Sequence, residues 1–135
     1  MTTVLFACVH NAGRSQMAAA FFNAVADPAK AHAVSAGTMP AAQVHPEVVE
    51  VMREIGIDLA TAQPRAMISI PLHFVDMLVT MGCAMEECPV APGVRCEDWP
   101  LADPKGQSPA RVREIRDEIR ERVRRLVVAE GWAAA

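Results

Sequence analysis

Short apolar runs along the chain predict the strands of a buried sheet. Residues 2–7 and 31–35 form two such runs, and turn-forming residues follow each of them. Residues 74–81 are mostly apolar, with little alternation between polar and apolar positions, and predict a third buried strand. The stretch 82–106 is rich in Pro and Gly and leaves room for one short strand at 94–98. The pattern therefore predicts four strands.

Apolar residues spaced three and four positions apart predict the helices. One helix follows the first strand and a short loop, a second begins at Pro46 and ends near Gly56, and a third is capped by Ser108. Residues 65–72 are ambiguous, because Pro71 limits any helix there. Strands that alternate with helices predict an α/β fold with a four-stranded parallel sheet covered on both faces, a three-layer α/β/α arrangement.

Composition sets the size and surroundings of the protein. The 135 residues are 52% hydrophobic and 21% charged, which predicts one compact domain over residues 1–135. A formal net charge of −3 gives no reason to expect binding to nucleic acid or to an anionic membrane. No apolar run is long enough for a membrane span or a signal peptide, so we expect a cytoplasmic protein whose four cysteines do not form a static disulfide framework.

The segment from Cys8 to Ser15 carries the chemistry. A cysteine ends the first predicted strand, and Arg14 and Ser15 open the helix that follows. Backbone N–H groups at a helix N-terminus bind multiply charged oxyanions, and an arginine adds a two-pronged donor. The same field favours a thiolate, so Cys8 is the expected nucleophile, with the Ser15 hydroxyl as a donor to it. The residues expected to surround the oxyanion lie between the strand and the helix: Val9, His10, Asn11, Ala12, Gly13 and Arg14. The alternative is that Cys8 is a buried apolar residue at a strand end.

Four stretches resemble one known family. The run Cys-Val-His-Asn-Ala-Gly-Arg-Ser at 8–15 looks like the signature of the low-molecular-weight tyrosine phosphatases and of the arsenate reductases that share their fold. The longer stretch 8–18 is similar to the reductase branch, as are residues 35–37, 80–83 and 97–99. The resemblance covers nearly the whole chain, and it is to the thioredoxin-coupled reductases.

This resemblance implies further roles. It places a general acid at Asp103, in the pair Asp103-Pro104, to protonate the departing oxygen. It also implies a thiol relay, in which Cys83 attacks Cys8 as arsenite leaves and Cys88 then attacks Cys83. The substrate would be arsenate, with phosphate or sulfate as competitors. No bound cofactor is expected, and electrons would come from thioredoxin or from a low-molecular-weight thiol such as mycothiol or glutathione.

Two other functions remain open at this point. A phosphatase would use the same Cys8, Arg14 and Asp103, but the chain has no tyrosine and Lys105 follows the Asp-Pro pair, so an aromatic wall for phosphotyrosine is missing. A non-enzymatic arsenic or redox sensor would use the thiols as a binding site. Repeated turnover separates a reductase from such a sensor.

No metal site is expected. His32, His45 and His73 lack metal-ligand spacing, and His10 is interpreted as a wall of the loop. Cys96 is interpreted as a strand residue. The alternative, zinc held by the three later cysteines and a histidine, lacks a second close pair of ligands. Ala19 stands where some reductases carry a glutamate that helps to hold potassium, so no potassium requirement is predicted.

Overall fold

Four parallel strands form the sheet in the part of the chain that the computed structural model describes, residues 1–82 and 93–134. In spatial order they are β2 (Ala31–Gly37), β1 (Thr2–Cys8), β3 (Met77–Thr80) and β4 (Arg95–Asp98). β1 therefore lies inside the sheet, and its residues 4–8 are buried. The predicted four-stranded parallel α/β fold is confirmed.

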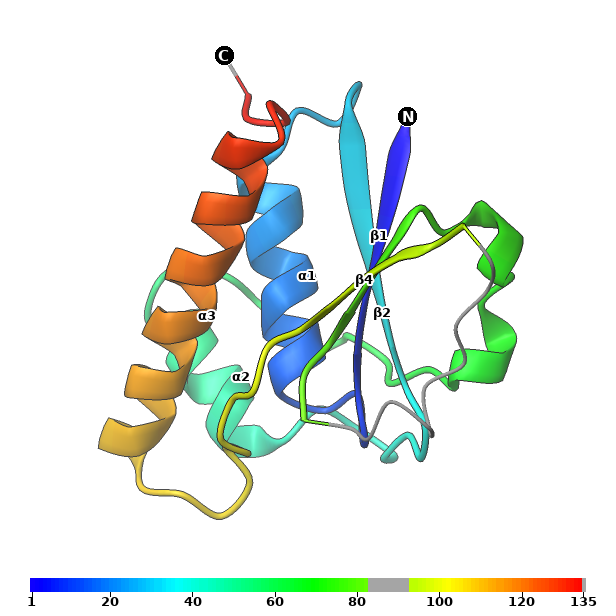
Figure 1. The fold of residues 1–135 in the computed structure, drawn as a ribbon. Coiled ribbons are helices and arrows are strands. Elements are labelled where there is room, and N and C mark those ends of the chain that lie inside the picture. Colours follow the sequence, from blue (N-terminus) through cyan, green and yellow to red (C-terminus); the bar gives the residue numbers. More distant parts are fainter. Residues whose placement is uncertain (83–92, 135) are drawn as a thin grey trace.

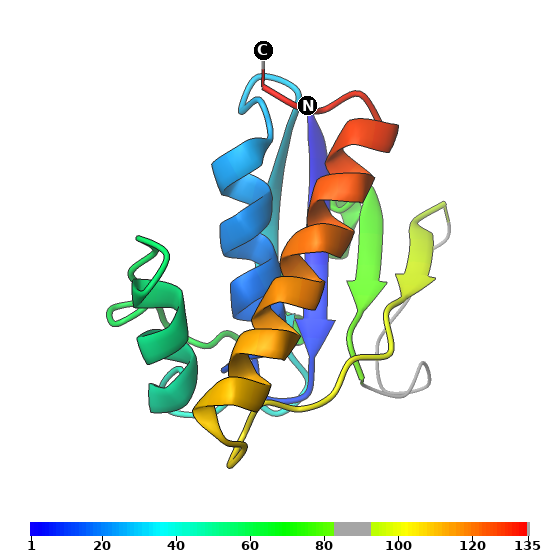
Figure 2. The same ribbon diagram turned by 90° about the vertical axis from the view of Figure 1, so that its left-hand side faces the viewer.

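Three helices cover one face of this sheet, α1 (Arg14–Val25), α2 (Pro46–Arg53) and α3 (Pro109–Ala129). Figures 1 and 2 show α1 and α3 side by side against the strands, with α2 beside the start of α3. Alternate residues of β1, among them Val4 and Phe6, face these helices, and the Phe6 and Phe22 rings lie 6.0 Å apart. The main core thus lies between β1 and the helical layer.

The other face carries a thinner cover. Its apolar residues, including Leu5 and Ala7, pack against the segment that holds two 3-10 turns, η1 (Met67–Ser69) and η2 (Leu72–Phe74). Figure 1 shows this segment, in green, across the sheet from the helices. Both faces are covered, as predicted, and the described residues of this second layer form 3-10 turns in and directly after the stretch 65–72 that the sequence left ambiguous.

The third strand is shorter than predicted. We expected it at 74–81, whereas β3 begins at Met77. Phe74 belongs to η2 instead, because the turn after Pro71 bonds its N–H to the Pro71 carbonyl, and its side chain is exposed. Asp76 then anchors the chain to β1 by accepting from the Thr3 N–H at 2.8 Å. An apolar run alone does not reveal this turn.

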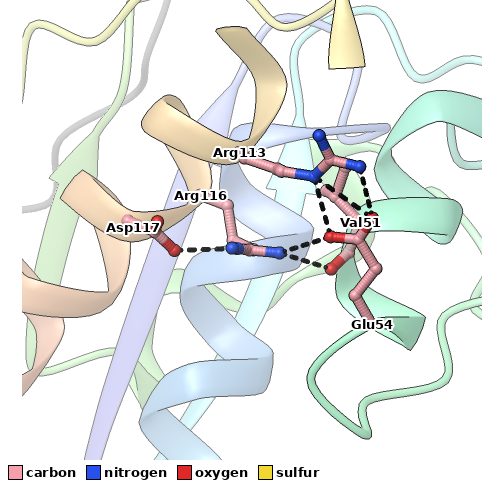
Figure 3. A network of polar contacts seen from close by, with 5 residues as sticks. All are labelled: Val51, Glu54, Arg113, Arg116 and Asp117. Carbon is pink, nitrogen blue, oxygen red and sulfur yellow. Dashed lines mark hydrogen bonds and ion pairs between the residues drawn. The ribbon is translucent and has the colours of Figure 1, made fainter. Parts of the chain in front are cut away.

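An arginine ties the second helix to the third. Arg116, on α3, is buried and donates to the Val51 carbonyl at 2.9 Å and to Glu54 at 3.0 Å, both at the end of α2. Arg113 donates to the same Glu54 carboxylate, and Asp117 accepts from Arg116, as Figure 3 shows. These charge-assisted bonds satisfy a carbonyl at the helix end and lower the pKa of Glu54, chiefly through its bond with Arg113.

The carboxyl ends of the strands meet at one edge of the sheet. Cys8 is opposite Gly37 in the register, and Ala7 is opposite Thr80. In open parallel sheets this edge is where ligands bind. Among the described residues, no helix is long and apolar enough to cross a membrane.

Candidate active site

The loop after β1 is bonded to its neighbours through its carbonyl groups. The carbonyls of Cys8, Val9 and His10 accept from the N–H groups of residues 38, 39 and 41, at 3.2, 2.8 and 2.9 Å. The Ala12 carbonyl accepts from the His45 N–H at 2.9 Å. Since the C=O and N–H of one trans peptide point in opposite directions, the N–H groups that follow these carbonyls face the other side of the loop. This arrangement leaves these N–H groups available to an anion.

A chain of side-chain hydrogen bonds ends on the Cys8 sulfur. The Arg65 N–H donates to Asn11 Oδ1 at 2.8 Å, which fixes the Asn11 amide with its Nδ2 toward Ser15 Oγ, also at 2.8 Å. Ser15 Oγ accepts that bond and lies 2.9 Å from Cys8 Sγ, so its own hydrogen is free to point at the sulfur. Cys8 itself is 2% exposed. A hydroxyl that donates to sulfur stabilises the thiolate, which is the form that attacks.

Asn11 adopts a backbone conformation that few residues tolerate. Its φ is 48°, and among the described residues it is the only one other than glycine with a positive φ. Asparagine accepts this left-handed region more readily than most residues. The predicted role of Asn11 in holding the loop is therefore visible both in its backbone and in its side chain.

Arg14 is the first residue of α1, directly after the loop, and is largely buried, at 7% exposure. One terminal nitrogen donates to the Leu101 carbonyl at 3.1 Å, and the other is 3.9 Å from an Asp103 oxygen. Its Nε is buried and has no hydrogen-bond partner among the described residues. Buried donors are nearly always satisfied, so the unpaired guanidinium nitrogen of Arg14 is a donor available to an anion.

Asp103 reaches the site from the segment before α3. Its side chain is 47% exposed, and Oδ1 accepts from the Lys105 N–H at 3.0 Å. The adjacent Pro104 is buried and lies close to the loop. A Cβ at Gly13 would be only 2.8 Å from Pro104 Cγ. The predicted acid thus stands next to the predicted arginine, at the rim of the loop.

Three residues near the site were not predicted to contact it. A Cβ at Gly37 would lie 2.5 Å from the Val9 carbonyl oxygen, so this glycine lets the loop rest on β2. Gly82, with φ 90°, lies so close to the Arg14 guanidinium that any side chain there would collide with it. His45 borders Gly13, and its partial burial lowers the imidazole pKa, although Glu47 and Asp103 oppose the change. The glycines stand in stretches that resemble the reductases, whereas no signal in the sequence pointed to His45.

The remaining candidates lie elsewhere. The His10 ring bonds the Met39 carbonyl at 3.1 Å, as fits a loop wall. Cys96 is half-buried on β4, where we expected a strand residue. Cys83 and Cys88 lie outside the described residues, so their predicted relay stays a prediction. Among residues 1–82 and 93–134, no three His, Cys, Asp or Glu side chains form a group that could hold a metal.

Comparison with known proteins identifies the family. Residues 3–132 match the model of the low molecular weight phosphotyrosine protein phosphatases. The chain is 45% identical over 122 residues to a putative arsenate reductase of Halobacterium salinarum, covering 87% of this chain and 85% of that protein. It is 32% identical to a glutaredoxin arsenate reductase of Synechocystis, covering 94% and 97%. A solved thioredoxin-dependent arsenate reductase of Corynebacterium glutamicum superposes with a TM-score of 0.78 at 36% identity, covering 96% of this chain and 61% of that one. With its loop, arginine and fold in agreement, the chain belongs to the low-molecular-weight phosphotyrosine phosphatase family.

Proposed function

We propose that this protein reduces arsenate to arsenite, with Cys8 as the nucleophile. The observation that carries the proposal is that two groups at the ends of the loop are buried, the Cys8 sulfur, with its Ser15 donor at 2.9 Å, and the unpaired Nε of Arg14. Such a pair suits a tetrahedral oxyanion that is attacked by a thiolate. The names of the relatives support arsenate among the possible oxyanions, since those at 45% and 32% identity are called arsenate reductases.

In the first step the Cys8 thiolate attacks arsenic. A sulfur–arsenic bond forms, one arsenic–oxygen bond breaks, and the departing oxygen leaves as water after a proton arrives. Asp103, 3.9 Å from the guanidinium that would hold the substrate, is the proposed proton donor. Arsenic is still As(V) in this adduct, and Arg14 and the loop amides balance its charge. Phosphate and sulfate would compete for the same cradle.

The second step needs a second thiol, and we propose Cys83 for it. Its thiolate would attack the Cys8 sulfur, the electrons of the sulfur–arsenic bond would pass to arsenic, and arsenite would leave as As(III). Cys88 would then attack Cys83, which frees Cys8 and leaves a Cys83–Cys88 disulfide. Gly82 packs against Arg14 and directly precedes Cys83 in the chain. The segment that carries Cys83 and Cys88 therefore starts next to Arg14.

Thioredoxin is the proposed source of electrons, in the reducing cytoplasm, with no cofactor bound to the protein. Thioredoxin carries a dithiol, which can open the Cys83–Cys88 disulfide by exchange. Relatives differ here, since one is named thioredoxin-dependent and another is named a glutaredoxin arsenate reductase. A small thiol that attacks the Cys8 adduct directly is the competing route.

The test is arsenate-dependent NADPH oxidation in the presence of thioredoxin and thioredoxin reductase. The intact protein should turn over, whereas Cys8→Ser, Cys83→Ser and Cys88→Ser should not. Cys96→Ser, which removes a half-buried strand cysteine away from the loop, is the matched control and should turn over normally. If turnover requires glutathione or mycothiol, that thiol replaces thioredoxin as the proposed reductant, and Cys8 remains the proposed nucleophile. Hydrolysis of aryl phosphates without arsenate reduction would make the protein a phosphatase.

A further inference from the structure

Gln16 occupies a place that the reaction itself does not explain. It lies in the first turn of α1 and is 8% exposed. Its side-chain amide turns back toward the loop, and Nε2 lies 3.1 Å from the Asn11 carbonyl, 3.2 Å from Asn11 Oδ1 and 3.4 Å from the Gln63 carbonyl. A buried amide nitrogen with oxygens on several sides is a specific arrangement, because its two hydrogens have to serve all of them.

The direction of this amide is determined by its neighbours. If Gln16 were turned over, its Oε1 would face two backbone carbonyls and Asn11 Oδ1, and oxygen would meet oxygen in a buried place. Asn11 cannot turn over to compensate, because the Arg65 N–H also requires an acceptor at Oδ1. Gln16 and the Arg65 N–H therefore hold the Asn11 side chain from two sides, and its Nδ2 stays on Ser15.

We propose that Gln16 is a positioning residue that keeps Cys8 in the thiolate form by holding Asn11, and through it Ser15, in place. Its bond to the Asn11 carbonyl also stabilises the left-handed conformation of that residue, whose φ is 48°. Its contact with the Gln63 carbonyl joins the segment that covers the second sheet face to the loop. Among the described residues, the hydrogen bonds of the Gln16 side chain go to Asn11 and Gln63, so it acts through Asn11.

The inference deepens the proposed function, since it concerns the same nucleophile, but its test does not need arsenate. In a background of Cys83→Ser, Cys88→Ser and Cys96→Ser, the ultraviolet absorbance of the thiolate reports Cys8 alone as the pH is varied. Gln16→Met keeps the size of the side chain and removes its hydrogens. We expect the midpoint of the thiolate transition to move up by about one pH unit, the size of one weakened hydrogen bond to a charged group.

Gln43→Met is the control, because it makes the same change at an exposed glutamine and should leave the transition where it was. Thermal unfolding checks that each variant folds. If Gln16→Met does not fold, Gln16→Leu answers the same question, since its side chain also has no hydrogen for the three oxygens and adds no charge. A folded Gln16 variant with an unmoved thiolate transition would overturn the proposal. Absence of arsenate turnover in the intact protein, together with the expected shift in Gln16→Met, would count against the proposed function instead.

Discussion

The two sides of the oxyanion site differ in burial and in the number of contacts that hold them. On one side, residues 8 and 11–15 of the loop are buried, and both the loop carbonyls and the side chains of Asn11 and Ser15 are bonded. On the other side, Asp103 is about half exposed and reaches Arg14 only at 3.9 Å. The buried Pro104 and the hydrogen bond from Arg14 to the Leu101 carbonyl join the segment 101–105 to the loop, whereas the Asp103 carboxylate lies outside both contacts.

This difference separates the two tasks of the site. A thiolate and an anion cradle work best when their donors are already in place, because rearranging them during the reaction would cost free energy. A proton donor has to approach an oxygen that arrives with the substrate, and such contacts are often long before the substrate binds. Changes in the loop should therefore harm every reaction of the protein, whereas changes on the acid side should harm only those whose leaving oxygen needs a proton.

The largest effect is expected at the residue that both sides share. Arg14→Lys keeps the charge but loses the planar fork, together with the bond to the Leu101 carbonyl and the free Nε. We expect kcat/KM for arsenate to fall on the order of 10³-fold, the upper range for removing one preorganised donor. Steady-state kinetics measure this, and Arg53→Lys, at an exposed arginine, serves as control. A fall of less than tenfold would mean that the guanidinium is not the cradle.

The acid side should respond more selectively. Asp103→Asn removes the proton but preserves the size of the side chain, and kcat for arsenate should fall about 100-fold. The same variant should lose far less with an aryl phosphate whose leaving group needs no proton, because the loop is untouched. Measuring both substrates on one preparation sharpens the contrast. Equal losses on both would show that Asp103 supports the loop rather than acting as an acid.

Two glycines allow a matched comparison of the sides. Gly37→Ala would place a Cβ 2.5 Å from the Val9 carbonyl oxygen, so the loop backbone has to move. Gly13→Ala would press instead on Pro104 Cγ, at 2.8 Å. We expect Gly37→Ala to lower activity on both substrates and to cost about 1–3 kcal/mol of stability, and Gly13→Ala to affect mainly arsenate. Chemical denaturation and the two assays measure this, and the reverse pattern would contradict the comparison.

Sequence reasoning found the parts of the site that are local in the chain. The strand, loop and helix from residue 2 to 25 follow one another directly, so an apolar run, a glycine loop and helical spacing were sufficient to place Cys8 and Arg14 together. Asp103 came from the resemblance, because an Asp-Pro pair alone indicates only a turn. Its neighbour Pro104 meets Gly13 across 91 positions of the chain.

Contacts between distant segments could not be predicted in this way. The Arg65 N–H that orients Asn11 comes from the segment we left ambiguous, and it is a backbone group, which no side-chain pattern can reveal. Our prediction started the third strand too early for a similar reason. Phe74 and Val75 are apolar and look like strand residues, whereas the bond from the Thr3 N–H to Asp76 directly before β3 is a contact between distant segments. His45 was passed over because one histidine carries no spacing signal.

The smallest effect is expected at His45, and it probes whether Asp103 stays over the loop. Burial lowers the His45 pKa in the folded protein, so the unfolded chain binds more protons below the ordinary histidine value of about 6.5. Stability should therefore fall as the pH drops through that value, and this part of the loss should disappear in His45→Gln. Unfolding measured at about pH 7.5 and pH 5.5 gives the difference for each protein.

Asp103 enters this titration with the opposite sign. Its charge raises the His45 pKa, as does that of Glu47, whereas Lys105 and His10 lower it. Asp103→Asn should therefore lower the His45 pKa further, and an NMR titration of the imidazole would record the shift. Because Asp103 is held by few contacts, this electrostatic reading reports how much of the time its carboxylate remains near the loop. An unchanged His45 titration in Asp103→Asn would mean that the acid rests away from the loop and approaches only when substrate is bound.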